Sequence, residues 1–253
     1  MVVVTILLAI LLTADFRFRH AAAETPDPTL LNSPTVATLS LEEPLRLIQE
    51  ARRAYSRVRD YECTLIKRER LANGTLPPET VMLMQIRTEP HSVRLVWQEP
   101  AEVTGQEAVF VTGRNQGKIR ARAAGALSLI GFVSLDPRSP RAMGTSQYPM
   151  SGAGVGTLIE RFGDSWERES RNQTARVKID LGEFSGRSCI RVEVEHQEPG
   201  EGLIFGRCVV WFDQVTSLPV RVENYDWAGE LAEVFSFTGM KLNIGFADAV
   251  FEK

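Results

Sequence analysis

Histidine and cysteine are scarce in this sequence. The 253 residues include only His20, His91 and His196, and the three cysteines form no C-x-x-C pair. Zinc sites and thioredoxin-like redox sites need these side chains at short spacings, so both classes are disfavoured. The G-x-S-x-G, H-E-x-x-H and Walker lysine signatures are also absent. We therefore expect no metal, no cofactor and no recognisable catalytic group.

Charge of one sign is scarce as well. The formal net charge is −3, from 29 basic and 32 acidic residues that are interspersed along the chain. Nucleic-acid-binding domains carry a basic patch or stripe, and proteins that bind anionic membranes often carry a polybasic run. The sequence shows neither pattern, so we expect no nucleic-acid partner, and no polybasic run indicates binding to an anionic membrane surface.

The N-terminus is predicted to be a signal peptide, residues 1–23. Residues 2–12 are nearly all apolar, and Ala21-Ala22-Ala23 provides the A-x-A pattern that signal peptidase cleaves. This run is too short for a bilayer-spanning helix, which needs ~20 residues. Basic residues follow the run and none precedes it, so an uncleaved N-terminus is the alternative. We expect export to the periplasm or cell envelope, and a flexible Pro- and Thr-rich leader over residues 24–40.

Hydrophobic periodicity predicts a mainly antiparallel β protein with few helices (α+β). Helical spacing begins at the capping-box pattern Ser40-x-x-Glu43 and recurs over residues 155–170. Alternating segments joined by short turns, without helices between them, are antiparallel neighbours. We expect one domain over residues 41–253. Its predicted strands are residues 61–70, 81–87, 93–97, 108–112, 118–123, 175–181, 188–196, 203–212, 218–225 and 231–237.

Two of these segments are apolar on both faces, residues 81–86 and 203–212. An antiparallel strand with one wet face alternates between apolar and polar residues, so these strands need cover on both sides. Packed helices could supply this cover, and a bound apolar ligand could supply part of it. The apolar segment 126–133 and the helix 155–170 are the expected cover.

Cys189 and Cys208 lie on two predicted strands that are joined by a turn. A cross-strand disulfide is one interpretation, because antiparallel pairs can have the Cα spacing that a disulfide accepts and the periplasm is oxidising. Two buried thiols on facing strands are the other. Cys63 would remain a buried thiol.

Three further patterns could indicate a catalytic or ligand-binding site. The glycine-rich residues 152–156 lack the G-x-G-x-x-G spacing and are better explained as a flexible start of the next helix. Glu193 and Glu195 share a face and His196 points away from both, so solvated edge residues explain them better than a hydrolase site. Residues 136–140, with Asp-Pro and Ser-Pro, either contact a ligand or form ordinary turns.

Several motifs resemble the bacterial domain of unknown function 1571 family, and the likeness spans residues 41–253. The motifs are Tyr61-Glu62-Cys63-Thr64-Leu65-Ile66-Lys67-Arg68-Glu69-Arg70, Glu99-Pro100-Ala101-Glu102-Val103-Thr104-Gly105-Gln106-Glu107, Val133-Ser134-Leu135-Asp136-Pro137 with Ser139-Pro140 and Tyr148-Pro149, Leu218-Pro219-Val220-Arg221, Tyr225-Asp226-Trp227 and Lys241-Leu242-Asn243-Ile244-Gly245. That family is distantly similar to the periplasmic lipoprotein carriers LolA and LolB. The resemblance implies their fold, an unclosed curved β-barrel covered by helices, with an apolar cavity for acyl chains. No LolA functional residue aligns with a position of this chain.

We therefore expect a non-catalytic exported protein that binds an acyl chain, a lipid or a lipidated protein, with peripheral or transient membrane contact. A structural or assembly module of the envelope with a self-filled core is the alternative, and an uncharacterised hydrolase is the third interpretation. A strand register that is wrong by one residue would move a predicted wall residue to the other face. The predicted cavity wall consists of Leu83, Leu95, Trp97, Phe110, Phe132, Val209 and Trp211.

Overall fold

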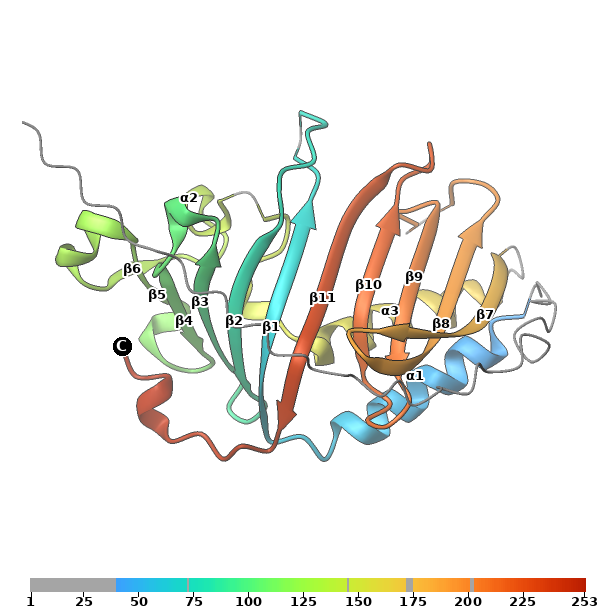
Figure 1. Cartoon of the computed structure of the whole chain (residues 1–253), viewed down its shortest axis with the longest axis horizontal. Helices are drawn as coiled ribbons and strands as arrows, with labels where there is room; N and C mark the ends of the chain where they lie inside the picture. Colours follow the sequence, from blue (N-terminus) through green and yellow to red (C-terminus); the bar gives the residue numbers. More distant parts are fainter. Residues whose placement is uncertain (1–39, 72, 145, 172–174, 201–202) are drawn as a thin grey trace, which may run out of the picture. The chain divides into compact units, whose positions relative to one another are not determined.

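An antiparallel sheet of eleven strands organises the chain (Figure 1). The computed structural model describes residues 40–253 except 72, 145, 172–174 and 201–202. These residues belong to one compact unit, Thr35–Lys253. The predicted signal peptide and the leader as far as residue 39 lie outside the described residues.

The strand order is β6-β5-β4-β3-β2-β1-β11-β10-β9-β8-β7. The first and last strands of the chain are therefore neighbours in the middle of the sheet, and β6 and β7 are its two edges. This confirms the predicted open, mainly antiparallel fold. The strands are β1 (Asp60–Glu69), β2 (Thr80–Arg87), β3 (Ser92–Glu99), β4 (Glu107–Val111), β5 (Ile119–Arg122), β6 (Val133–Leu135), β7 (Ala175–Phe184), β8 (Arg187–His196), β9 (Arg207–Asp213), β10 (Pro219–Tyr225) and β11 (Leu231–Leu242).

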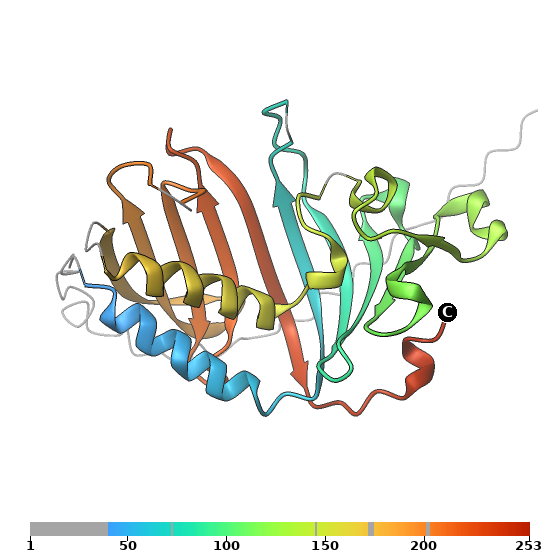
Figure 2. The ribbon, with the colours of Figure 1, turned by 180° about the vertical axis from the view of Figure 1, so that it is seen from behind.

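Two helices, α1 (Glu42–Tyr55) and α3 (Val155–Glu169), lie side by side on one face of the sheet (Figure 2). We call this the helix-covered face and the opposite one the outer face. The shorter segments are α2 (Pro140–Met143), η2 (Ala101–Val103), η3 (Asn115–Gly117), η4 (Gly125–Ile130), η5 (Met150–Gly152) and η6 (Asp248–Val250).

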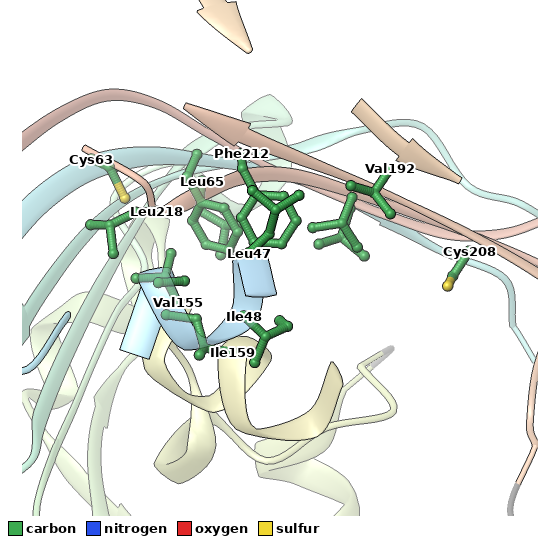
Figure 3. Close-up of a cluster of buried hydrophobic side chains, with 14 of the residues drawn as sticks. Leu47, Ile48, Cys63, Leu65, Val155, Ile159, Val192, Cys208, Phe212 and Leu218 are labelled. Carbon is green, nitrogen blue, oxygen red and sulfur yellow. The ribbon is translucent and has the colours of Figure 1, made fainter. Parts of the chain in front are cut away.

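Both long helices are amphipathic, which explains why they pack here. The buried side of α1 includes Leu47, Ile48 and Ala51, while Arg46 on its exposed side pairs with Glu43 and Glu50. The buried side of α3 includes Ile159 and Trp166. These side chains meet Leu65 of β1, Phe212 of β9 and Leu218, which precedes β10, in one core (Figure 3).

Glycines allow α1 and α3 to approach closely. A Cβ atom at Gly156 would lie 2.4 Å from the ring of Tyr55, and one at Gly163 would lie 2.4 Å from the guanidinium of Arg52. The glycine-rich segment noted in the sequence therefore serves packing. At its start the Val155 N–H donates to the Tyr61 hydroxyl (2.9 Å), which fixes the beginning of α3 on β1.

Two segments differ from the sequence prediction. The prediction that residues 126–133 cover the sheet is wrong: they form η4 and the start of β6, and Leu127, Leu129 and Ile130 are exposed. The strand predicted at 203–212 begins at Arg207. Strand β6 is absent from the predicted strands because three residues are too few to show an alternating pattern.

Candidate ligand pocket

A pocket of 370 Å³ lies between α1 and the end of the sheet formed by β7, β8 and β9. Its volume is within the range of small-molecule sites, about 300–1,000 Å³. The lining residues are Leu47 and Glu50 of α1, Leu181 of β7, Ile190 of β8, Phe212 and Asp213 of β9, and Gln214 and Ser217 of the following turn.

The floor of this pocket is a row of three apolar side chains. Leu181 pairs with Ile190 across β7 and β8, and Ile190 pairs with Phe212 across β8 and β9. Leu47 contributes a fourth apolar side chain from α1. Because β7 is an edge strand, Leu181 remains 78% exposed despite its place in this row. An apolar side chain in a pocket but open to solvent gains free energy when a hydrophobic ligand covers it.

Asp213 fixes the polar rim of the pocket. Its carboxylate is fully buried and accepts hydrogen bonds from the backbone N–H groups of Val215 (3.0 Å) and Thr216 (2.7 Å). It also accepts from the Thr216 hydroxyl (2.9 Å) and forms an ion pair with Arg187. One side chain thus shapes the turn that carries Gln214 and Ser217.

None of the seven predicted wall residues lines this pocket. Leu95, Trp97 and Phe110 lie on the helix-covered face of β3 and β4, where they are buried in the core or pack against it. Leu83 pairs with Thr64 and Val96, which places it on the outer face. Phe132 packs beneath the guanidinium of Arg122 (5.2 Å to the ring centroid).

The register of β9 places Val209 and Trp211 on the outer face. Val209 pairs with two glutamates, Glu193 and Glu223, while its neighbours Cys208 and Val210 face the helices. The Trp211 indole N–H donates to Glu223 (3.2 Å). The outer face of β9 is therefore covered by a layer of charged and aromatic side chains.

The same register separates Cys189 from Cys208. Cys189 lies opposite Asp213 and Cys208 lies opposite Val194, and all three cysteines are free, buried thiols. Burial raises the pKa of Cys63 and of Cys208 to about 12. Both are therefore protonated at neutral pH, which is unfavourable for a nucleophile.

His196 pairs with Glu169 at the end of α3, not with the nearby Glu193 or Glu195. Both members of the pair are nearly inaccessible, and the Trp227 ring lies 6.3 Å from the imidazole. This contact holds the C-terminal end of α3 against β8. Spacing in the sequence could not reveal it, because Glu169 and His196 are brought together by the tertiary fold.

A buried polar cluster occupies the helix-covered face where β1 and β11 meet. Glu69 and Glu233 lie directly opposite each other. The Tyr148 hydroxyl (2.9 Å) and the Asn224 amide (2.7 Å) donate to Glu233, and the Gln147 N–H (2.7 Å) donates to Glu69. Lys67 also pairs with Glu69 (2.5 Å). These hydrogen bonds attach residues 146–148 to the sheet. Because both carboxylates are buried, a substrate would have little access to them.

Burial is the main reason that the pKa of Glu233 is raised above its usual range. Hydrogen bonds from Asn224 and Tyr148 lower it in part, and the neighbouring Glu69 raises it further. A carboxyl group with a raised native pKa binds its proton more tightly in the folded than in the unfolded state. Its contribution to stability is present below the unfolded pKa and is lost as the pH rises through the folded pKa.

We therefore expect Glu233→Gln to stabilise the protein at pH 7 by about 1 kcal/mol, the order of one poorly compensated buried polar group. The gain should disappear as the pH falls below about 4.5, near the ordinary pKa of a glutamate. Urea unfolding at pH 7 and pH 4 measures both quantities.

Glu223→Gln is the matched control, because its change in stability at pH 7 is expected to have the opposite sign. Burial opposes ionisation of Glu223, but hydrogen bonds from Tyr225 and Arg221 outweigh it and lower the pKa. Glu223→Gln should therefore be less stable than the wild type at pH 7 and as stable as the wild type at low pH. If both substitutions shift stability in the same direction at pH 7, the assignment of Glu233 is wrong.

Within the described part of the chain, no three His, Cys, Asp or Glu side chains are grouped so that they could hold a metal ion. None of the described helices has the length and hydropathy needed to cross a bilayer.

The family model for DUF1571, a protein family of unknown function, matches residues 58–253. The chain belongs to the DUF1571 family. A search of curated proteins finds no relative.

Several solved structures are similar to this member of the family. The Mycobacterium tuberculosis lipoprotein LppX is 14% identical with a TM-score of 0.47, over 80% of this chain and 96% of LppX. The Pseudomonas aeruginosa MucA/MucB complex matches with 16% identity and a TM-score of 0.47, over 83% of this chain and 61% of the matched chain. A LolA superfamily protein from Nitrosomonas europaea, the likeness expected from the sequence, is 12% identical with a TM-score of 0.33, over 82% of this chain and 96% of the other.

Proposed function

We propose that this DUF1571 protein is an exported, non-catalytic binding protein of the cell envelope. Its ligand is an acyl chain, a lipid or a lipidated protein, held in the pocket between α1 and strands β7–β9. The observation that carries the proposal is the row Leu181, Ile190 and Phe212, an apolar floor beneath an open pocket of 370 Å³. The A-x-A pattern before Glu24 supports export.

Hydrophobic transfer alone can supply the affinity in such a site. Each buried methylene group contributes about 0.8 kcal/mol, and no charged contact is needed along the chain. The polar groups of Glu50, Asp213, Gln214 and Ser217 border the apolar floor. A ligand with one polar end would therefore place its chain against the floor and its head group at this border.

We expect Leu181→Asp to weaken binding of a fluorescent fatty acid at least tenfold. The substitution replaces an apolar floor residue by a charge at a site exposed enough that the fold should tolerate it. Fluorescence titration of the delipidated protein measures the dissociation constant. Ile204→Asp is the control, because Ile204 is 68% exposed and lies outside the pocket. Absence of saturable binding by the wild-type protein, or equal losses in both variants, would end the proposal.

Trp97→Ala tests the wall predicted from the sequence. Leu95, Trp97 and Phe110 share the helix-covered face with the pocket but lie toward β3 and β4, and Trp97 and Phe110 are only partly buried. Loss of affinity in Trp97→Ala, with none in Leu181→Asp, would place the ligand against these strands.

A structural or assembly module of the envelope is the second candidate function. It is favoured by the core beneath α1 and α3, which the protein fills with its own side chains (Figure 3). This candidate requires a protein partner and no saturable fatty-acid binding, so the same titration distinguishes it from the first.

A further inference from the structure

Three large apolar side chains form an exposed tip at the β6 end of the sheet. Leu127, Leu129 and Ile130 of η4 are 62%, 91% and 71% exposed. We call them the apolar tip. Figure 1 shows this segment beside β6, at the end of the sheet away from α1 and α3. None of the three belongs to a core cluster or packs against one.

The local backbone holds the tip outward. Gly125 and Gly131 on either side have positive φ angles of 59° and 80°, which glycine adopts without strain. The Gly131 N–H donates to the Ser128 carbonyl (3.0 Å), which closes the last turn. The other exposed large hydrophobic residues of the described chain are single positions, which is ordinary for a surface, whereas a contiguous group signals an interaction.

The segment around the tip is strongly basic. Residues 113–142 contain six basic residues, Arg114, Lys118, Arg120, Arg122, Arg138 and Arg141, and one acidic residue, Asp136. The difference, 6 − 1, is +5 in a chain whose net charge is −3. The basic residues are spread over β5, α2 and the connecting segments, which is why the sequence shows no polybasic run.

Three of these cations are available to a partner. Arg122 pairs with Glu107, Arg114 pairs with Glu252, and Arg120 donates to Ser134. In contrast, Lys118, Arg138 and Arg141 are exposed, and the described residues offer them no ion pair. Exposed aliphatic side chains combined with unpaired cations match a surface that has an apolar interior and anionic head groups.

We propose that the apolar tip inserts into the surface of an anionic lipid bilayer, with Lys118, Arg138 and Arg141 contacting the head groups. A second copy of the chain fits less well, because its own basic segment would repel the first. This docking surface is separate from the pocket under α1, so either proposal can fail without the other.

Vesicle flotation tests the docking surface. The full chain, expressed with its own N-terminal segment, is mixed with neutral phosphatidylcholine vesicles or with vesicles containing about 30% phosphatidylglycerol. The wild-type protein should float with the anionic vesicles, and added salt should weaken this binding. Leu129→Glu should reduce the bound fraction at least tenfold, and the double variant R138E/R141E should reduce it on anionic vesicles.

Ile204→Glu is the matched control, because Ile204 is 68% exposed and lies outside the pocket. It should bind as the wild-type protein does. Fatty-acid binding by Leu129→Glu should be unchanged, which separates this test from that of the pocket. Equal flotation of Leu129→Glu and the wild type would overturn the proposal. A wild-type dimer that Leu129→Glu converts to a monomer, measured by sedimentation velocity, would overturn it too and assign the tip to a second copy.

Discussion

Trp166→Ala should lower the free energy of unfolding by about 3–5 kcal/mol, the range for removing a large buried aromatic side chain. Trp166 is only 1% exposed and is among the largest fully buried side chains of the described residues. It packs against Phe162 (5.4 Å between ring centroids) and belongs to the same buried core as Cys208 of β9. Removing it leaves a cavity between α3 and β9 that the surrounding sheet cannot close.

Urea unfolding followed by circular dichroism measures this loss. Leu129→Ala is the control, because Leu129 is 91% exposed and lies far from α3, and it should cost less than about 1 kcal/mol. Equal losses in the two variants would mean that α3 does not pack on the sheet through Trp166.

Asp213→Ala should be the second severe substitution, with an expected cost of about 3–5 kcal/mol. The substitution removes the buried partner of Arg187 and leaves two backbone N–H groups of the β9–β10 turn without their acceptor. Because this turn carries Gln214 and Ser217, fatty-acid affinity should fall together with stability.

Asp213→Asn separates the two roles of this side chain. The amide oxygen can still accept from Val215 and Thr216, but the charge that pairs with Arg187 is gone. We expect a smaller loss of stability, with the pocket largely retained. If Asp213→Asn costs as much stability as Asp213→Ala, the ion pair with Arg187 contributes more to stability than the hydrogen bonds of the turn.

The positions of most strands could be predicted because turns and alternation are local signals. The pairing of β1 with β11 could not, because it joins segments at opposite ends of the chain. The face of β9 that meets the helices could not be predicted for another reason: both of its faces are apolar, so alternation did not reveal that Phe212 faces the helices and Trp211 does not. That ambiguity placed Val209 and Trp211 among the predicted wall residues.

The polar contacts were the least predictable features. Glu69 and Glu233 meet only because β1 and β11 are neighbours, and Glu169 meets His196 only because α3 crosses the sheet. Leu181 was overlooked as a floor residue because its strand is otherwise largely polar. Only the sheet register brings it beside Ile190 and Phe212.

Photo-crosslinking with a diazirine-bearing fatty acid, followed by peptide mass spectrometry, locates the bound ligand directly. The expected result is saturable labelling of Leu47, Leu181, Ile190 and Phe212 that excess unlabelled fatty acid suppresses. Labelling that does not saturate, or that is confined to Trp97 and Phe110 or to the apolar tip, would contradict binding between α1 and strands β7–β9.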